Sequence, residues 1–295
     1  MKESLAAEEI DINENILLRQ SSELLKLLLK DRTTGRNIIW ATNTYEKMGK
    51  GYKAADSITI KHVTGTQQTL IRPRVEKLKY EQKNRTKGKA EVFTTTWIVK
   101  LQADIVDEEF QLLPLEEYVE KTWLEITSGE APYMVSRYDS VTGEYLSISE
   151  RVGFVDRKLK RISDEVADPS EWIRLVKKAY QASYGYEYQG DSLLIARENL
   201  LYTFIDYYHE KFNHVPDLEL QIEIAKIISY NVFQMDGLKY IIPLSDQADD
   251  IEQLDLFGGF EEFAEIAEPK GIFVKIKDWQ ANKLIEFRSL GDSEE

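Results

Sequence analysis

The feature that most limits the fold of this chain is an alternation of strand-like and helical segments that begins near residue 120. The stretch LEEYVEKTWLEITSG predicts a helix that leads into a strand ending at Gly129. A second helix is predicted to start at Asp168-Pro169-Ser170 and to stop at Gly185. A long helix over SLLIARENLLYTFIDYYHEKF, a third over Leu218 to Ser229 and a strand-like NVFQMDGLKYIIP follow. Such alternation favours an α/β fold built on a sheet.

The flanking parts of the chain predict further elements. Residues 14–30 have apolar positions at helical spacing, which indicates an amphipathic helix. The stretches NIIWAT and ADSITIKHV predict short strands, and the tail FVKIKDW-QANK-LIEFRSL predicts a β-hairpin. We therefore divide the chain into an N-terminal helix and strand extension with a basic connector (1–90), a core (91–245), an acidic loop (246–271) and a C-terminal hairpin (272–295).

The composition indicates a globular protein and excludes several kinds of site. Hydrophobic residues make up 42% of the 295 residues, which is enough for a sizeable core. The chain has no cysteine, so disulfides, cysteine nucleophiles and thiolate metal sites are excluded, and a reducing cytoplasm is the expected location. The N-terminus lacks the layout of a signal peptide, and no apolar run reaches membrane-spanning length.

Charge is distributed unevenly along the chain. The net charge of −14 argues against non-specific binding of nucleic acid over the whole surface. Residues 72–89, however, are strongly basic, and this segment is either a DNA-phosphate contact or a solvated connector. The cations that would contact DNA are Arg72, Arg74, Lys77, Lys79, Lys83, Arg85, Lys87 and Lys89.

Four segments occur in an order that is found in one enzyme family. They are GKAEVFTTTWIV (88–99), LEITSGEAPY (124–133), YGYEYQGDSLLIARENL (184–200) and NVFQMDGL (231–238). In this order they resemble the phenylalanine-threonine-proline segment, the cofactor loop and the second-strand and third-strand segments of adenine-specific DNA methyltransferases. These enzymes are the modification subunits of restriction systems. The resemblance covers roughly residues 88 to 240 and implies an abbreviated Rossmann-like methyltransferase sheet with an N-terminal mixed α+β extension.

The resemblance implies that the chain binds S-adenosylmethionine. Gly129 would let the backbone approach the cofactor, Glu187 would accept the ribose hydroxyls, and Asp236 would accept from the adenine amino group. This chain departs from the family at Ala131, where the loop usually has a second glycine, and at Thr95, which replaces the proline. The full set of expected cofactor-binding residues is Phe93, Thr94, Glu125, Ser128, Gly129, Ala131, Glu187 and Asp236.

Each assignment also has an ordinary structural interpretation. Gly129 could simply end a strand, Glu187 could cap the following helix, and Asp236-Gly237 could be a turn pair. The order of the segments, each after a predicted strand, favours the functional interpretation.

The family's catalytic segment, an Asn or Asp followed by two prolines and an aromatic, is not found after Asp236. The nearest tetrapeptide, Glu130-Ala131-Pro132-Tyr133, lies inside the cofactor loop. Glu130, Pro132 and Tyr133 are therefore either a relocated catalytic segment or residues that shape that loop. We expect a partner subunit to supply catalysis and DNA recognition, because the first strand would otherwise keep an open edge unless the terminal hairpin covers it.

Two other functions remain open. The chain could be a non-catalytic scaffold that keeps a degenerate methyltransferase fold. It could also be an adaptor for the replication sliding clamp, because Gln253, Leu254, Leu256 and Phe257 resemble the short peptide that docks on that clamp. The three histidines have no metal-ligand spacing, so no metal site is expected.

Overall fold

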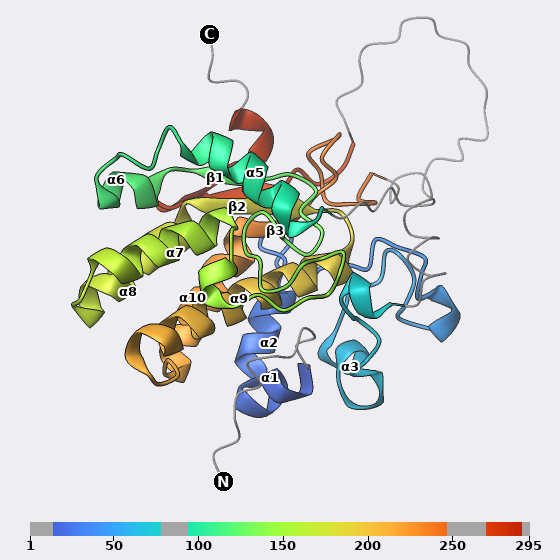
Figure 1. Ribbon diagram of the computed structural model, residues 1–295. Coiled ribbons are helices and arrows are strands. Elements are labelled where there is room, and N and C mark those ends of the chain that lie inside the picture. Colours follow the sequence, from blue (N-terminus) through green and yellow to red (C-terminus); the bar gives the residue numbers. More distant parts are fainter. Residues whose placement is uncertain (1–13, 78–93, 247–269, 291–295) are drawn as a thin grey trace, which may run out of the picture.

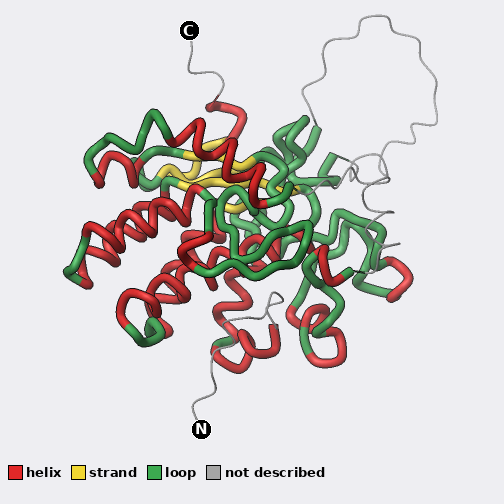
Figure 2. The backbone as a smooth tube through the Cα atoms, in the orientation of Figure 1, coloured by secondary structure: helices red, strands yellow, loops and turns green. Residues whose placement is uncertain are grey.

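A computed structural model describes residues 14–77, 94–246 and 270–290. The described chain is a mixed α/β structure around a parallel sheet of three short strands, β1 (Trp123–Glu125), β2 (Ser183–Glu187) and β3 (Val232–Gln234) (Figures 1 and 2). Strand β2 lies in the middle, pairing with β1 on one side and with β3 on the other. The carboxyl ends of all three strands therefore meet at one edge of the sheet.

Helices connect the strands in pairs, as the sequence predicted for most of them. Between β1 and β2 lie α7 (Phe154–Glu165), which the sequence analysis missed, and α8 (Pro169–Gln181). The side chain of Asp168 caps α8 by accepting from Glu171 N, which confirms the predicted start of this helix. The predicted stop at Gly185 is wrong, because α8 ends at Gln181 and Gly185 lies within β2. Between β2 and β3 lie α9 (Gly190–Phe212) and α10 (Leu218–Asn231). Every residue of α9 from 190 to 201 is buried, rather than one broad face of the helix.

The N-terminal residues share the hydrophobic core of these helices. The predicted helix over 14–30 is broken at Ser21 into α1 (Glu14–Gln20) and α2 (Ser22–Leu29), and α2 packs against α10. The two predicted strands at 37–42 and 55–63 are wrong. Only an isolated bridge joins Ile39 to Ser57, and residues 60–63 form the short helix α3 (Ile60–Val63). Instead of belonging to a ladder, the backbone N–H of Ile39 donates to the side chain of Gln234 at 2.9 Å.

The predicted C-terminal hairpin is confirmed as β4 (Lys275–Asp278) and β5 (Lys283–Glu286), followed by a 3-10 turn over 287–290. It packs on one face of the parallel sheet through a cluster that contains Tyr186, Phe233 and Ile276. It does not pair with β1, so it does not close that edge as one of our alternatives required. Within the described residues, the outer edge of β1 has no strand partner.

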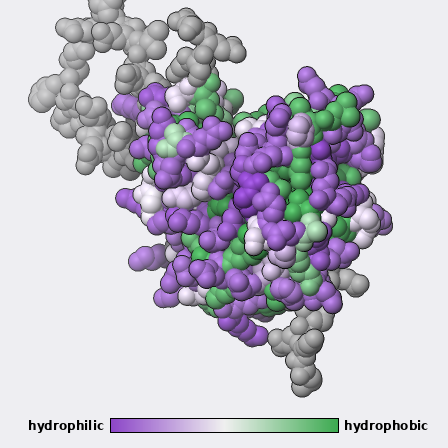
Figure 3. All heavy atoms as spheres, turned by 90° about the vertical axis from the view of Figure 1, so that its left-hand side faces the viewer, coloured by the Kyte–Doolittle hydropathy of each residue, from purple (hydrophilic) through white to green (hydrophobic). Residues whose placement is uncertain are grey.

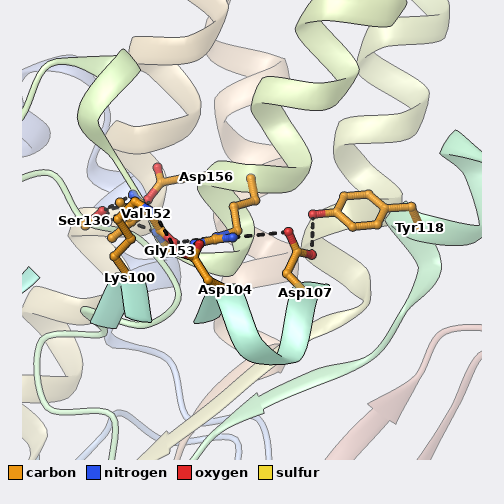
Figure 4. Close-up of polar contacts among 9 residues, drawn as sticks. Lys100, Asp104, Asp107, Tyr118, Ser136, Val152, Gly153 and Asp156 are labelled. Carbon is orange, nitrogen blue, oxygen red and sulfur yellow. Dashed lines mark hydrogen bonds and ion pairs between the residues drawn. The ribbon is translucent and has the colours of Figure 1, made fainter. Parts of the chain in front are cut away.

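Two helices precede β1, namely α5 (Thr96–Asp107) and α6 (Leu115–Glu120). Polar contacts fasten the inner side of α5 to neighbouring elements (Figure 4). The Arg157 guanidinium of α7 donates to Asp104 at 2.6 Å and to Asp107 at 3.2 Å, and Asp107 also accepts from Tyr118 Oη of α6 at 2.8 Å. The contacts hold α5 alongside the start of α7.

The face that lies on the left in Figure 1 is mostly hydrophilic, with apolar atoms showing between the charged side chains (Figure 3). Ion pairs join α6 to α8 here: Glu116 contacts Arg174 at 2.7 Å and Lys178 at 2.6 Å. Among the residues that the structure describes, no helix combines the length and apolar character needed to cross a bilayer.

Candidate functional site

The loop after β1 meets the end of β2 at the carboxyl edge of the sheet. Gly129 has a φ of +55°, a conformation that suits glycine. Its backbone N–H donates to Glu187 Oε2 at 2.8 Å, and the N–H of Gln189 donates to Glu187 Oε1 at 3.0 Å. The structure thus brings together Gly129 and Glu187, which lie 58 residues apart in the sequence. Glu187 bridges the two loops that follow adjacent strands.

The carboxylate of Glu187 is a buried hydrogen-bond acceptor. Its side chain is buried, and burial, reinforced by the negative charge of Asp191, raises its pKa, while hydrogen bonds from backbone N–H groups act in the opposite direction. Each carboxylate oxygen has two lone pairs, and each accepts one backbone N–H here. The backbone N–H of Tyr188 also acts on this carboxylate, and the capacity that these N–H groups leave unused can accept a further hydroxyl donor.

Polar atoms with unused hydrogen-bonding capacity lie around this bridge. Ser128 Oγ and Gln189 Oε1 are buried and have no hydrogen-bond partner among the described residues. Ser128 precedes Gly129, and Gln189 holds Glu187 through its backbone. Buried polar atoms are nearly always hydrogen-bonded, so their orphaned state is evidence for a polar ligand or ordered water at this edge.

Glu125 stabilises the loop that follows β1. It is the last residue of β1, and its carboxylate accepts from the backbone N–H groups of Tyr133 at 3.2 Å and Met134 at 2.8 Å. Burial raises its pKa to about 8, and the nearby Glu187 adds to that rise, while the two backbone donors oppose it. Glu125 thus holds the shape of residues 125–134. Ala131 continues the tight turn at a φ of +62° and is completely buried.

Asp236 follows β3, but its side chain forms a local turn. Its Oδ1 accepts from the backbone N–H of Leu238 at 3.0 Å and of Lys239 at 3.3 Å. The preceding residue, Met235, donates its N–H to the backbone oxygen of Glu187 at 3.1 Å. Asp236 therefore lies at the same edge of the sheet as Glu187, but the hydrogen bonds of its side chain are those of an ordinary turn.

The three candidate catalytic residues, Glu130, Pro132 and Tyr133, lie in the loop between β1 and α7. Glu130 is buried, and its carboxylate accepts from Arg74 N at 2.6 Å and from Tyr138 Oη at 2.8 Å. Tyr133 Oη contacts Gln102 of α5, and Pro132 is partly buried. The hydrogen bonds of Glu130 support the interpretation that this tetrapeptide shapes the loop.

The segment before α5 is described only in part. Thr94 accepts at its backbone oxygen from Ser140 Oγ at 3.0 Å. Phe93 lies outside the described residues. The five cations Lys79, Lys83, Arg85, Lys87 and Lys89 also lie outside them, as do Gln253, Leu254, Leu256 and Phe257 of the expected clamp peptide.

The described cations of the basic segment are not arranged as an open surface. Lys77 is buried, with its Nζ 3.9 Å from Asp191 Oδ2, and Arg72 and Arg74 are partly buried. Asp191 also accepts from Tyr45 Oη at 2.7 Å. Sequence reasoning missed Asp191 and Tyr45. Asp191 stands four residues after Glu187 in the first turn of α9, and this position was the only available signal.

The cavity with a defined lining lies elsewhere, between the terminal hairpin and the amino-terminal ends of β1 and β2. Its volume is about 620 Å³, and its lining includes Leu124, Tyr184, Ile276, Trp279, Phe287 and Leu290. The described residues contain no group of three or more His, Cys, Asp or Glu side chains that could hold a metal ion. Comparison of the chain with protein-family models, curated proteins and solved structures found no match.

Proposed function

We propose that this chain binds S-adenosylmethionine at the carboxyl edge of β1 and β2 and works as the cofactor-binding, adenine DNA methyltransferase-like subunit of a DNA-modification complex. The observation that carries the proposal is the bridge from Glu187 to Gly129, because it joins a glycine loop after one strand to an acid at the end of the next. The parallel pairing of β1, β2 and β3 supports it, since it brings to one edge the carboxyl ends of the strands, where ligands of open parallel sheets bind.

The residues at this edge suit such a cofactor. Glu187 would accept ribose hydroxyls with its remaining lone pairs, and Ser128 Oγ and Gln189 Oε1 offer polar atoms that otherwise lack partners among the described residues. Gly129 supplies a backbone surface without a Cβ. When bound, S-adenosylmethionine would supply an electrophilic methyl group. The role of this chain is to bind and orient the cofactor, and Glu125 and Glu130 stabilise the loop that does so.

A partner subunit is part of the proposal. Ile126, which directly follows β1, is 63% exposed, and the outer edge of β1 lacks a strand partner among the described residues. Parallel sheets are usually covered on both faces and protected at their edges, which supports a second chain beside β1. That chain would bring the catalytic segment and the surface that recognises DNA.

Calorimetric titration of the full chain with S-adenosylmethionine tests the proposal. We expect binding by the wild type and at least a tenfold weaker affinity for Glu187→Ala, because the ribose acceptor is removed. Glu219→Ala, an exposed acid in the first turn of α10, is the matched control and should leave affinity unchanged. Absence of binding by the wild type, or equal affinity of Glu187→Ala, contradicts the proposal.

A further inference from the structure

Helix α5 exposes several of its large apolar side chains, although it lies at the surface of the protein. Its buried residues are Val99 and Ala103. Trp97, Leu101 and Ile105 follow one another at intervals of four residues and are 67%, 55% and 66% exposed. Residues at this spacing lie on the same face of a helix, so they form one continuous apolar stripe that faces away from the protein.

Residues outside this stripe attach α5 to the rest of the protein. Arg157 forms ion pairs with Asp104 and Asp107, and Gln102 contacts Tyr133. Phe110, which follows the helix, packs edge-on against Trp123 at 6.2 Å between ring centroids. The contact of Phe110 brings the segment after α5 next to Trp123 of β1, whose outer edge has no strand partner among the described residues. Large exposed apolar groups in such a row mark an interaction surface on a soluble protein.

The charges around the stripe indicate what covers it. Glu108 continues the stripe at the end of α5, and Glu109 follows it. Neither has an ion pair among the described residues. Carboxylates at the C-terminal end of a helix oppose its dipole, so their position does not stabilise α5 itself. Residues 94–121 contain seven acids, of which Asp104, Asp107, Glu116 and Glu120 form ion pairs within the protein, so the charge that faces a partner here is that of Glu108, Glu109 and Glu117.

We propose that α5 docks an amphipathic helix of a different protein, which covers Trp97, Leu101 and Ile105 with its apolar face and meets Glu108 and Glu109 with lysine or arginine side chains. A helix fits because a row at intervals of four residues forms a ridge that packs into the groove of another helix. A second copy of this chain would bring the same carboxylates and a net charge of −14. The inference rests on the partner that the proposed function requires, and cofactor binding is measured separately from it.

The probe is a synthetic amphipathic peptide of roughly 20 residues, long enough to form a helix, with leucine on one face and lysine beside it. The matched peptide has glutamate in place of lysine. We expect the full chain to bind the lysine peptide, more weakly as salt rises, and to bind the glutamate peptide at least tenfold more weakly. Docking should shift the emission of Trp97 to shorter wavelength and protect it from acrylamide, and Trp97→Phe should remove this signal.

Three variants locate the binding surface. The pair Leu101→Ser and Ile105→Ser should weaken peptide binding at least tenfold, and the pair Glu108→Gln and Glu109→Gln should weaken it several-fold. Leu238→Ser changes another exposed leucine, at 95% exposure, and should leave binding unchanged. Both pairs are at the surface, so the variants should retain the circular dichroism spectrum of the wild type.

Failure of the lysine peptide to bind, equal binding of the two peptides or an unaffected Leu101→Ser/Ile105→Ser variant overturns the docking proposal. So does a wild-type dimer in sedimentation that this pair converts to a monomer, because a second copy would then cover the stripe. The pair should keep its affinity for S-adenosylmethionine, while Glu187→Ala should keep its affinity for the peptide. Loss of one property without the other therefore shows which proposal has failed.

Discussion

The substitution Gly190→Ala tests how the N-terminal residues are joined to the sheet. Gly190 is the first residue of α9, three positions after Glu187, and its N–H donates to the backbone oxygen of Trp40 at 3.0 Å. A Cβ at this position would lie 2.0 Å from the backbone oxygen of Ile39 and 2.9 Å from Ile58 Cδ1. The two backbones must therefore separate by about 1 Å or more to reach an ordinary contact distance.

The magnitude follows from the bonds that hold Ile39. Its N–H donates to Gln234 Oε1 and its oxygen accepts from Gln234 Nε2, each at 2.9 Å. Separation strains these two bonds and the bond between Gly190 and Trp40, which at about 1 kcal/mol each amounts to roughly 3 kcal/mol. Alanine recovers at most about 1 kcal/mol through its higher helix propensity. We expect Gly190→Ala to lower the free energy of unfolding by about 2 kcal/mol or more.

Urea denaturation followed by circular dichroism measures this change. Ser170→Ala, at an exposed position in the first turn of α8, is the control and should stay within about 0.5 kcal/mol of the wild type. Gln234→Glu, which lacks the donor to Ile39, should destabilise the protein as well and should combine less than additively with Gly190→Ala. A Gly190→Ala protein as stable as the wild type would refute this account of the contact between Ile39 and α9.

Two further predictions concern α7. Burial lowers the pKa of Lys158 to about 7 from 10.5, with Asp107 opposing the shift, so between these values the unfolded chain binds more protons than the folded protein. The contribution of Lys158 to stability should therefore rise with pH over this window. Lys158→Met should flatten the increase in the free energy of unfolding between pH 7 and 9, measured by urea titration. An unchanged dependence of this free energy on pH would contradict the lowered pKa of Lys158. Arg157→Ala should remove the ion pairs to Asp104 and Asp107 and lower the free energy of unfolding by up to about 1 kcal/mol. It should also speed hydrogen exchange across residues 96–107. Unaltered exchange in this range would mean that these ion pairs do not hold α5 in place.

Local signals were enough to predict several of the helices that flank the sheet. The cap at Asp168 and the apolar spacing of residues 218–229 depend on neighbours in the sequence, and the structure has helices at both places. The meeting of Gly129 with Glu187 agrees with what the family resemblance implied, since that resemblance put a glycine after the first strand and an acid at the end of the second, and parallel strands bring these ends together.

Long-range contacts explain what the sequence could not show. Residues 37–42 have the composition of a strand, yet Gln234, 195 positions away from Ile39, satisfies the backbone of that residue. Lys77 belongs to a basic run that suggested an exposed surface, but it is buried beside Asp191. Asp236 illustrates a third difficulty, since an acid and a glycine after a strand fit a ligand contact and a turn equally well, and only the hydrogen bonds reveal the turn.

Hydrogen exchange of the full chain with and without S-adenosylmethionine tests the central claim most directly, because it reports where the cofactor binds. We predict slower exchange in peptides that cover residues 126–131 and 187–190, and no change in the hairpin over 275–286 beside the 620 Å³ cavity. Unchanged exchange at both carboxyl-end loops under saturating cofactor, or protection confined to the hairpin, would contradict the account.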